Sequence, residues 1–434
     1  MRRWILAALL APVLQTQAQG APTSEARPIA LADAVAQAQR NAPIAVQARG
    51  TLRSTAAATR TAYSAFLPTL SINGSGSRST GSTFFQGNLV PLTGSPYNFT
   101  NGITSSVDLF TGFRRLNDLK RAHADETAAE SNETVQRYTV AFQVKQQYYA
   151  ALAARESESA ALAQVQQAEQ QFRAAAARVS AGAATKSDSL RSVITVGNAK
   201  LALLTSQNNL RVANAALTRL VASPTPVTPV LADTMDPGSL ALDSAGLAAA
   251  ALEGPAVKQS RAQLASAAAA ARGARSTFLP SVNLSLSLTG NNPQTAFAPT
   301  AGQFAYQDNM RLTVAYPIFN GLVREQTAVT TSVAEDNATA TLRDASLLAR
   351  QQFAQLLGVI NTAQQQIAIQ RASLAAAEED LRVQQQRYSL GASTLLDVLT
   401  SQTALNSARA ALIQARFDYR NAKAQLEQLV GRDL

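Results

Sequence analysis

Residues 66–75 read FLPTLSINGS and residues 278–287 read FLPSVNLSLS, so the same kind of junction occurs twice in one chain. Each time, an alanine-rich stretch ends at Phe-Leu-Pro, and a run follows in which apolar and small polar residues alternate. Pro68 and Pro280 lack the amide hydrogen that a helix needs, and each favours an extended conformation in the residue before it. The two junctions therefore mark places where a helix gives way to a strand.

The rest of the chain repeats together with these junctions. NAPIAVQAR at 41–49 matches EGPAVKQSR at 253–261, which lies 212 residues later. RVSAGAATKSD at 178–188 matches RYSLGASTLLD at 387–397, which lies 209 residues later. The spacing changes only between the Phe-Leu-Pro junction and Phe110, so the first copy carries three extra residues there. Matches that keep their spacing over the whole chain indicate an internal duplication.

Four runs with a period of two residues are expected to form two β-hairpins, at 69–109 and 281–318. In one of these runs the apolar residues, which alternate with small polar ones, are Val282, Leu284, Leu286 and Leu288. Each run has about ten residues, which is the length of a tilted strand that crosses a bilayer with one face toward lipid. A strand of a soluble sandwich with one solvated face shows the same alternation. The strands alone therefore leave both interpretations open.

Two stretches, 112–180 and 321–389, contain no proline and almost no turn-forming sequence. As helices each would be about 100 Å long, at a rise of 1.5 Å per residue. A helix of that length does not fit into one compact core. We therefore expect a coiled coil or a helical tube.

Each long stretch ends at a glycine, Gly182 or Gly391, the residue best able to adopt the left-handed conformation that closes a helix. A further helical run follows at once, which predicts two helical hairpins, 112–222 and 321–431, with these glycines at their tips. Large residues recur every seven positions in the last run, at Val398, Leu405, Leu412, Tyr419 and Leu426. Such a seam is typical of helices that pack closely along their length.

These features divide the chain into four parts. The predicted segments are a signal peptide at 1–18, a first repeat at 19–222, a proline-rich linker at 223–238 and a second repeat at 239–434. The signal peptide is indicated by two arginines, an apolar run and a small-residue cleavage site. No other stretch approaches the roughly 18 consecutive apolar residues of a membrane-spanning helix.

Four strands per chain are too few for a barrel, because the smallest barrels have about eight. Since open strand edges are not tolerated in lipid, several copies must share one barrel. Two copies would supply eight strands and three would supply twelve. The residues alone do not decide between them.

The chain resembles the TolC-like outer-membrane efflux proteins over essentially its whole mature length. The resemblance rests on LADAVAQAQRNAPI at 31–44, both Phe-Leu-Pro junctions, both Phe-x-Gly helix starts, and the long segment at 387–426 that begins RYSLGASTLLDVLTSQ. It implies an α+β membrane protein that forms a homotrimer. The trimer would share a 12-stranded barrel in the outer membrane of a Gram-negative bacterium, continued across the periplasm by a tube of α-helical hairpins.

The resemblance also implies the function, namely the exit duct of a tripartite efflux pump or of a type I secretion system. The expected partners are a periplasmic adaptor (membrane fusion) protein, an inner-membrane transporter of the RND, ABC or MFS class, and outer-membrane lipid, but not nucleic acid. The alternative is a soluble periplasmic coiled-coil scaffold without pore activity. The apolar row from Val282 to Leu288 argues against that alternative, because it is too apolar for a solvated edge. The cargo, drugs or a secreted polypeptide, stays open.

In this family the periplasmic end is closed by polar links between the two hairpins. Tyr388 stands at the position of the family's tyrosine, and Asp188 stands at that of the aspartate that the tyrosine reaches. Ser393 stands where the family has a linking arginine. One of the closing links is therefore expected to be absent.

Asp397 matches one member of an acidic ring at the aperture, whereas Thr400 replaces the second. Without the arginine link, the gate would be held more weakly, or by other residues such as Lys186. The alternative interpretation of Asp188 and Asp397 is that they are first-turn helix residues, which the helix dipole favours.

No catalytic, cofactor-binding or metal-binding motif is present in the sequence, so we expect neither an enzyme nor a cofactor. The chain has no cysteine, and its one histidine, His123, lies in a polar helical stretch. The net charge of +10 arises from scattered residues. A basic row at Arg409, Arg416 and Lys423 is expected to be a solvated helix face, with a pore lining as the alternative.

Overall fold

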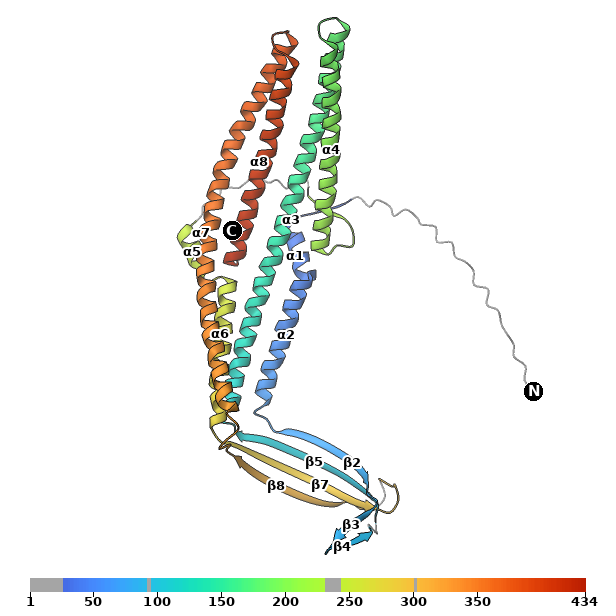
Figure 1. Cartoon of the computed structure of the whole chain (residues 1–434), viewed down its shortest axis with the longest axis vertical. Helices are drawn as coiled ribbons and strands as arrows, with labels where there is room; N and C mark the ends of the chain where they lie inside the picture. The colour runs from blue at the N-terminus through green and yellow to red at the C-terminus, as the bar shows by residue number, and fades with distance from the viewer. Residues whose placement is uncertain (1–25, 92–94, 231–242, 300–302) are drawn as a thin grey trace, which may run out of the picture.

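The computed structural model describes residues 26–91, 95–230, 243–299 and 303–434. The predicted signal peptide at 1–18 lies outside the described residues, as do residues 231–238 of the predicted linker. The molecule is long and narrow: a β-sheet lies at one end, and the helices extend away from it to two hairpin tips at the other end (Figure 1).

Long helices make up most of the structure. In the first repeat they are α1 (Leu31–Asn41), α2 (Pro43–Ser64), α3 (Arg114–Ser180) and α4 (Lys186–Val221). In the second repeat they are α5 (Ser244–Leu252), α6 (Pro255–Ala274), α7 (Val323–Ser389) and α8 (Leu395–Val430), with a 3-10 turn, η1 (Arg275–Phe278), after α6. Helices α3 and α7 each have 67 residues, and α4 and α8 each have 36. The equal lengths reflect the internal duplication.

The main sheet has four antiparallel strands in the order β2-β5-β7-β8. These are β2 (Thr69–Arg78), β5 (Tyr97–Phe110), β7 (Ser281–Gln294) and β8 (Ala305–Ala315). Beyond the end of β2, a small hairpin pairs β3 (Ser82–Phe85) with β4 (Asn88–Pro91). The pairing of β5 with β7 joins the two repeats. Among the described strands, β2 and β8 each have one edge without a partner.

A third, two-stranded sheet pairs β1 (Arg27–Ile29) in parallel with β6 (Val227–Pro229). Strand β6 lies inside the segment that the sequence suggested as a linker. Its position is fixed by Tyr148 of α3, whose hydroxyl donates to the Ile29 carbonyl at 3.0 Å and accepts from the Val230 amide at 3.3 Å. Three-residue strands carry no periodic signal, so this pairing was not predictable from the sequence.

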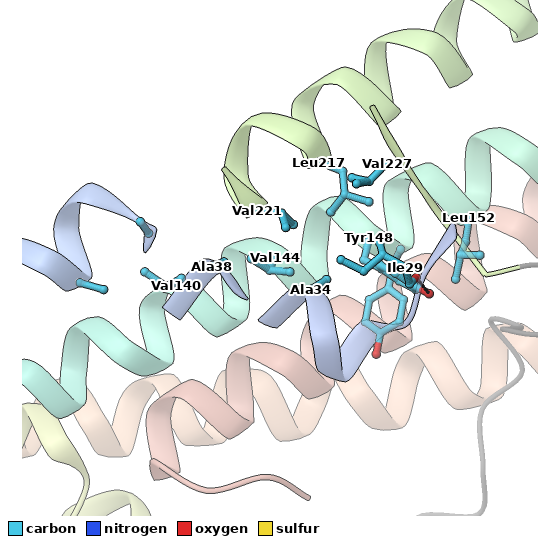
Figure 2. Packing of buried hydrophobic residues seen from close by; sticks show 13 residues of the cluster. Ile29, Ala34, Ala38, Val140, Val144, Tyr148, Leu152, Leu217, Val221 and Val227 are labelled. Atoms are coloured by element: carbon cyan, nitrogen blue, oxygen red, sulfur yellow. Dashed lines mark hydrogen bonds between the residues drawn. The ribbon is translucent and has the colours of Figure 1, made fainter. Parts of the chain in front are cut away.

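The first hydrophobic core surrounds the middle of α3 (Figure 2). Its α3 residues recur every four positions and form one buried stripe: Val140, Val144, Tyr148 and Leu152. Ala34 and Ala38 of α1, together with Leu217 of α4, pack against this stripe and are fully buried. A four-residue spacing places side chains on one helix face, so α3 holds α1 and α4 together here.

The heptad row predicted in the last helical run is buried in α8. Val398 and Leu405 belong to one core cluster, and Leu412, Tyr419 and Leu426 belong to another that includes Ile360 and Ile367 of α7. Burial of side chains of this size stabilises the fold by about 1.5–3 kcal/mol each. The hairpin of α7 and α8 is therefore packed along its whole length.

Each helix-to-strand junction is held by an arginine at the start of the next long helix. The Arg115 guanidinium stacks 5.0 Å from the Phe66 ring and donates to the carbonyls of Ala65 and Leu109. In the second repeat, Arg324 stacks 4.8 Å from the Phe278 ring and donates to two carbonyls just after β8. The phenylalanine of each Phe-Leu-Pro junction therefore lies beneath a guanidinium.

An ion cluster that is buried at Lys145 and Glu427 and exposed at Asp433 ties the two repeats together. Lys145 of α3 lies 2.6 Å from Glu427 of α8 and 2.8 Å from Asp433. The side chains of Lys145 and Glu427 are 14% and 8% exposed. Burial alone would lower the pKa of Lys145, but the hydrogen bonds to Asp433 and Glu427 outweigh it and raise the pKa above its ordinary value of 10.5.

Replacing Lys145 with methionine should lower the free energy of unfolding by about 2–3 kcal/mol, because the nearly buried Glu427 carboxylate loses its nearest cation. A raised lysine pKa means that the pair stabilises the fold fully below pH 10.5 and is lost as the pH rises through the higher folded-state pKa. Thermal melting followed by circular dichroism should separate the two proteins at neutral pH and bring them together in strong alkali.

Lys200 offers a matched control, because it forms a 3.0 Å ion pair with Glu169 on an exposed surface. Lys200→Met should change the melting temperature little, since exposed pairs contribute about 0–1 kcal/mol. Equal losses in the two variants would contradict the special role of the buried cluster.

Candidate functional site: the membrane sheet and the hairpin tips

One face of the main sheet is mainly apolar; on the described strands its only charged residues are Arg78 at the end of β2 and Asp308 of β8, which pairs with Leu288. The register aligns Val107 with Leu284 and Leu312, and Ile103 with Ile72 and Leu288. These side chains are not covered by any other element; Leu312 is 60% exposed and Met310 of the same strand is 74% exposed. A sheet face of this kind needs an apolar environment, which lipid provides.

The opposite face carries small hydroxyl and amide groups. Thr69 and Ser106 lie 2.9 Å apart, Ser75 and Thr100 lie 2.7 Å apart, and Asn283 donates to Asp108 at 2.9 Å. On the described strands the only charged residues of this face are Asp108 and Arg311. This face suits a water-filled interior with little charge selectivity.

Aromatic rings lie at both ends of the apolar face. Tyr306 and Tyr316 are ten residues apart, which corresponds to about 33 Å along a strand and about 25 Å across a bilayer at a tilt near 40°. At the Tyr306 end, the Phe297 ring contacts Tyr97 and Phe99 at 5.8 and 5.4 Å. Paired aromatic girdles at this separation are typical of outer-membrane strands.

Among the described residues, no helix combines the length and the apolar character that a bilayer-crossing helix needs. The same part of the chain contains no cluster of three or more histidine, cysteine or acidic side chains placed to hold a metal ion. His123 lies 2.9 Å from the Tyr63 hydroxyl, on a helix near the sheet.

At the other end of the molecule, Gly182 and Gly391 close α3 and α7 with φ angles of 72° and 76°. The helices that follow begin with the same capping box. The Asp188 carboxylate accepts from the Thr185 amide at 3.1 Å and from its hydroxyl at 2.9 Å. Asp397 accepts from the amide and hydroxyl of Thr394, both at 2.8 Å. The hydrogen bond from the Thr394 amide, followed by the one from its hydroxyl, holds the pKa of Asp397 below its usual range.

Both aspartates therefore occupy the first-turn positions that the alternative interpretation gave them. Within one chain, Tyr388 is not hydrogen-bonded to Asp188: in the described part of the structure the Tyr388 hydroxyl is buried without a partner. The remaining candidates make only local contacts. Ser393 donates to the Gln384 carbonyl at 3.3 Å and Thr400 to the Leu396 carbonyl at 2.9 Å, whereas Lys186 is exposed.

The link between the two hairpins comes from Arg178, a residue that the sequence analysis did not single out. Its guanidinium lies 4.5 Å from the centre of the Tyr388 ring, and its Nη1 donates to the Tyr388 carbonyl at 2.5 Å. A cation–π contact and a charge-assisted hydrogen bond together are among the stronger contacts between side chains. The available signal was that Arg178 opens the first copy of the repeated tip motif, RVSAGAATKSD.

A cavity of about 360 Å³ lies beside this contact, between the hairpins. It is lined by Gln167, Gln170, Gln171, Ala174 and Arg178 of α3, and by Gln385, Tyr388, Ser389, Leu395 and Val398 of the second hairpin. Apart from Arg178 the lining carries no charge. The joint between the hairpins of one chain is thus mainly amide-lined.

The basic row on α8 differs from the sequence prediction. Arg409 lies 3.3 Å from Glu378, Arg416 lies 3.8 Å from Glu156, and the Lys423 amine lies 3.9 Å from Glu427. The three basic side chains are only 19–30% exposed. The prediction of a solvated face was wrong, because α8 turns this row toward carboxylates on α3, α7 and its own next turn. Burial lowers the pKa of Lys423 in this setting.

The sequence matches the family described as "Outer membrane efflux protein" over residues 34–223 and 247–432. Since these segments cover most of the chain, the chain belongs to the outer membrane efflux protein family, and the resemblance seen in its sequence is confirmed. Its place is accordingly the outer membrane, with the helices extending into the periplasm.

Particular relatives support this assignment. The chain is 27% identical to the pyoverdine export outer membrane protein OpmQ of Pseudomonas aeruginosa over 343 residues, which span 77% of this chain and 70% of OpmQ. Its fold is similar to the CmeC outer membrane channel of Campylobacter jejuni, with a TM-score of 0.80, 18% identity, and coverage of 92% of this chain and 85% of CmeC. It is also similar to the open state of the MtrE outer membrane channel of Neisseria gonorrhoeae, with a TM-score of 0.78, 20% identity, and coverage of 93% and 89%.

Replacing Leu286 with arginine should destabilise the membrane sheet by about 2–4 kcal/mol, because this side chain lies near the middle of the apolar face. Ser287→Arg, one residue away on the polar face, should be tolerated. The measurement is the amount of folded, heat-modifiable protein recovered from outer membranes. Equal recovery of both variants would contradict the assignment of the two faces.

Proposed function

We propose that this chain forms, as a homotrimer, the exit duct of a tripartite export system. The observation that carries the proposal is that one chain holds a four-stranded membrane sheet with two open edges, continued by two helical hairpins about 100 Å long. Such a chain is complete only as part of a ring. Its family membership supports transport as the purpose of that ring.

Three copies would supply twelve strands, an even number within the range of known outer-membrane barrels. The polar sheet face would then line the interior and the apolar face would meet lipid. The small, nearly uncharged lining supports a passage that is wide and unselective, so selection of cargo would fall to the partners.

Small soluble molecules are the cargo that we propose. The support is the similarity to OpmQ, a protein that is named for pyoverdine export. Transport of this kind needs no chemistry from the duct, only a closed path for water and solute. Energy would come from an inner-membrane transporter, reached through a periplasmic adaptor.

The hairpin tips are the proposed docking site for the adaptor. Each tip presents large apolar side chains to solvent; Leu390 is 84% exposed, Leu396 is 60% exposed and Leu190 is 56% exposed. Exposed leucines at the end of a long hairpin favour contact with another protein.

The test of the proposed function is the mass and conductance of the purified protein. The mature chain, extracted from outer membranes in detergent, should have the mass of a trimer and should form conducting pores in planar bilayers. A stable monomer that never inserts would contradict the proposal and favour the soluble scaffold.

The periplasmic gate is proposed to include Tyr388, Asp188 and Asp397. Replacing both Tyr388 and Asp188 with alanine should raise the single-channel conductance, because two polar groups at the constriction are removed. Thr185→Ala is the matched control: it removes the other half of the Asp188 capping box and leaves the carboxylate in place. If Thr185→Ala raises the conductance equally, Asp188 acts only as a helix cap.

A further inference from the structure

The two hairpins of one chain correspond to each other through the internal duplication. In a closed ring, each hairpin would have two neighbours. One of these joints lies within the chain, where α3 and α8 pack side by side. Helices α4 and α7 lie on the outer sides of this layer (Figure 1). The offset of 209 residues carries α3 onto α7 and α4 onto α8. The joint between α3 and α8 is therefore a template for a joint between α7 of one copy and α4 of the next.

The joint within the chain shows which positions face each other. At the tip, Leu395, the first residue of α8, is only 4% exposed and lines the inter-hairpin cavity together with Gln170 and Gln171 of α3. Its equivalent in the first hairpin is Lys186, the first residue of α4, which is exposed. The position that is buried in the second hairpin is thus exposed in the first hairpin of an isolated chain.

The residues that would meet Lys186 follow from the same offset. Gln170 and Gln171 correspond to Glu379 and Asp380 of α7, and both of these carboxylates are exposed. Asp380 has no ion pair with any residue that the structure describes, and Glu379 has only an exposed pair with Arg382 in the next turn. At a joint between copies, two carboxylates would therefore take the places of the two amides, and a lysine would take the place of the leucine.

The position of Lys186 is itself unfavourable for an isolated chain. A cation in the first turn of a helix is repelled by the positive end of the helix dipole. No ion pair offsets this repulsion among the described residues. A neighbouring pair of carboxylates would.

The stacked link at the joint within the chain has no counterpart at the other joint. Arg178 stacks on Tyr388. The corresponding residues are Arg387 and Val179, and valine has no ring to receive a guanidinium. Arg387 instead donates to the Ala392 carbonyl of its own hairpin at 3.3 Å.

We propose that Lys186 of one copy contacts Glu379 and Asp380 of the neighbouring copy. The tip is then held by two unlike joints, a guanidinium–tyrosine contact within each chain and an ion pair between chains. The ion pair is exposed and weakened by salt, so a higher salt concentration loosens the joint between copies. This inference rests on the proposed ring of copies.

The absence of cysteine from the chain makes cross-linking a clean test. The double variant Lys186→Cys/Asp380→Cys, oxidised in outer membranes, should give covalent dimers and trimers on a non-reducing gel. The matched control is the equivalent pair at the joint within the chain, Leu395→Cys/Gln171→Cys. It should form a disulfide without any increase in mass.

A charge test keeps the inference falsifiable if a cysteine variant fails to fold. Lys186→Glu should raise the single-channel conductance severalfold, and adding Glu379→Lys and Asp380→Lys should restore it. In the unmodified protein, conductance should rise with salt concentration by more than the bulk conductivity does.

The outcomes separate this inference from the proposed function. A wild-type trimer that conducts, with no cross-link between positions 186 and 380 and no rescue by charge exchange, would overturn the inference and leave the duct intact. A wild-type protein that neither assembles nor conducts would overturn both.

Discussion

The constraint on which the rest of the structure depends is that a bilayer offers nothing to pair with exposed peptide groups. In the four-stranded sheet, the interior strands β5 and β7 pair on both sides, and their pairing with each other joins the two repeats. Strands β2 and β8 each keep one unpaired edge among the described strands. In the proposed ring, other copies would complete the sheet at those edges. The helices attached to the strands would then be brought into a ring as well, because each strand pair leads directly into a long helix.

That connection is rigid for identifiable reasons. Pro68 and Pro280 end the helical course of the backbone just before β2 and β7. Arg115 and Arg324 then bind both sides of each junction, through an aromatic ring on one side and backbone carbonyls on the other. One arginine side chain therefore ties the end of a helix to the sheet at each junction.

Much of this architecture was predictable from the sequence, since it depends on periodicity. Period-two runs indicated the membrane strands, and proline-free heptad stretches indicated the long hairpins with Gly182 and Gly391 at their tips. The β1–β6 pairing was not predicted, because three-residue strands are defined by their partners, here Tyr148, and not by their own sequence pattern. The ion pairs of Arg409 and Arg416 were not predicted, because the charge pattern does not tell which carboxylates α8 will face. The contact of Arg178 was not predicted, because its partner Tyr388 lies on the other hairpin, 210 residues away.

The unpaired edges of the sheet also have a consequence for mixtures of normal and defective chains. In the proposed ring, a copy with a damaged β2 edge would still offer an intact β8 edge, so it would enter an assembly and then prevent the ring from closing. Each defective copy would remove normal copies from use along with itself. Damage confined to one edge should therefore be dominant in a cell that makes both forms, whereas damage that stops the whole sheet from folding should be recessive.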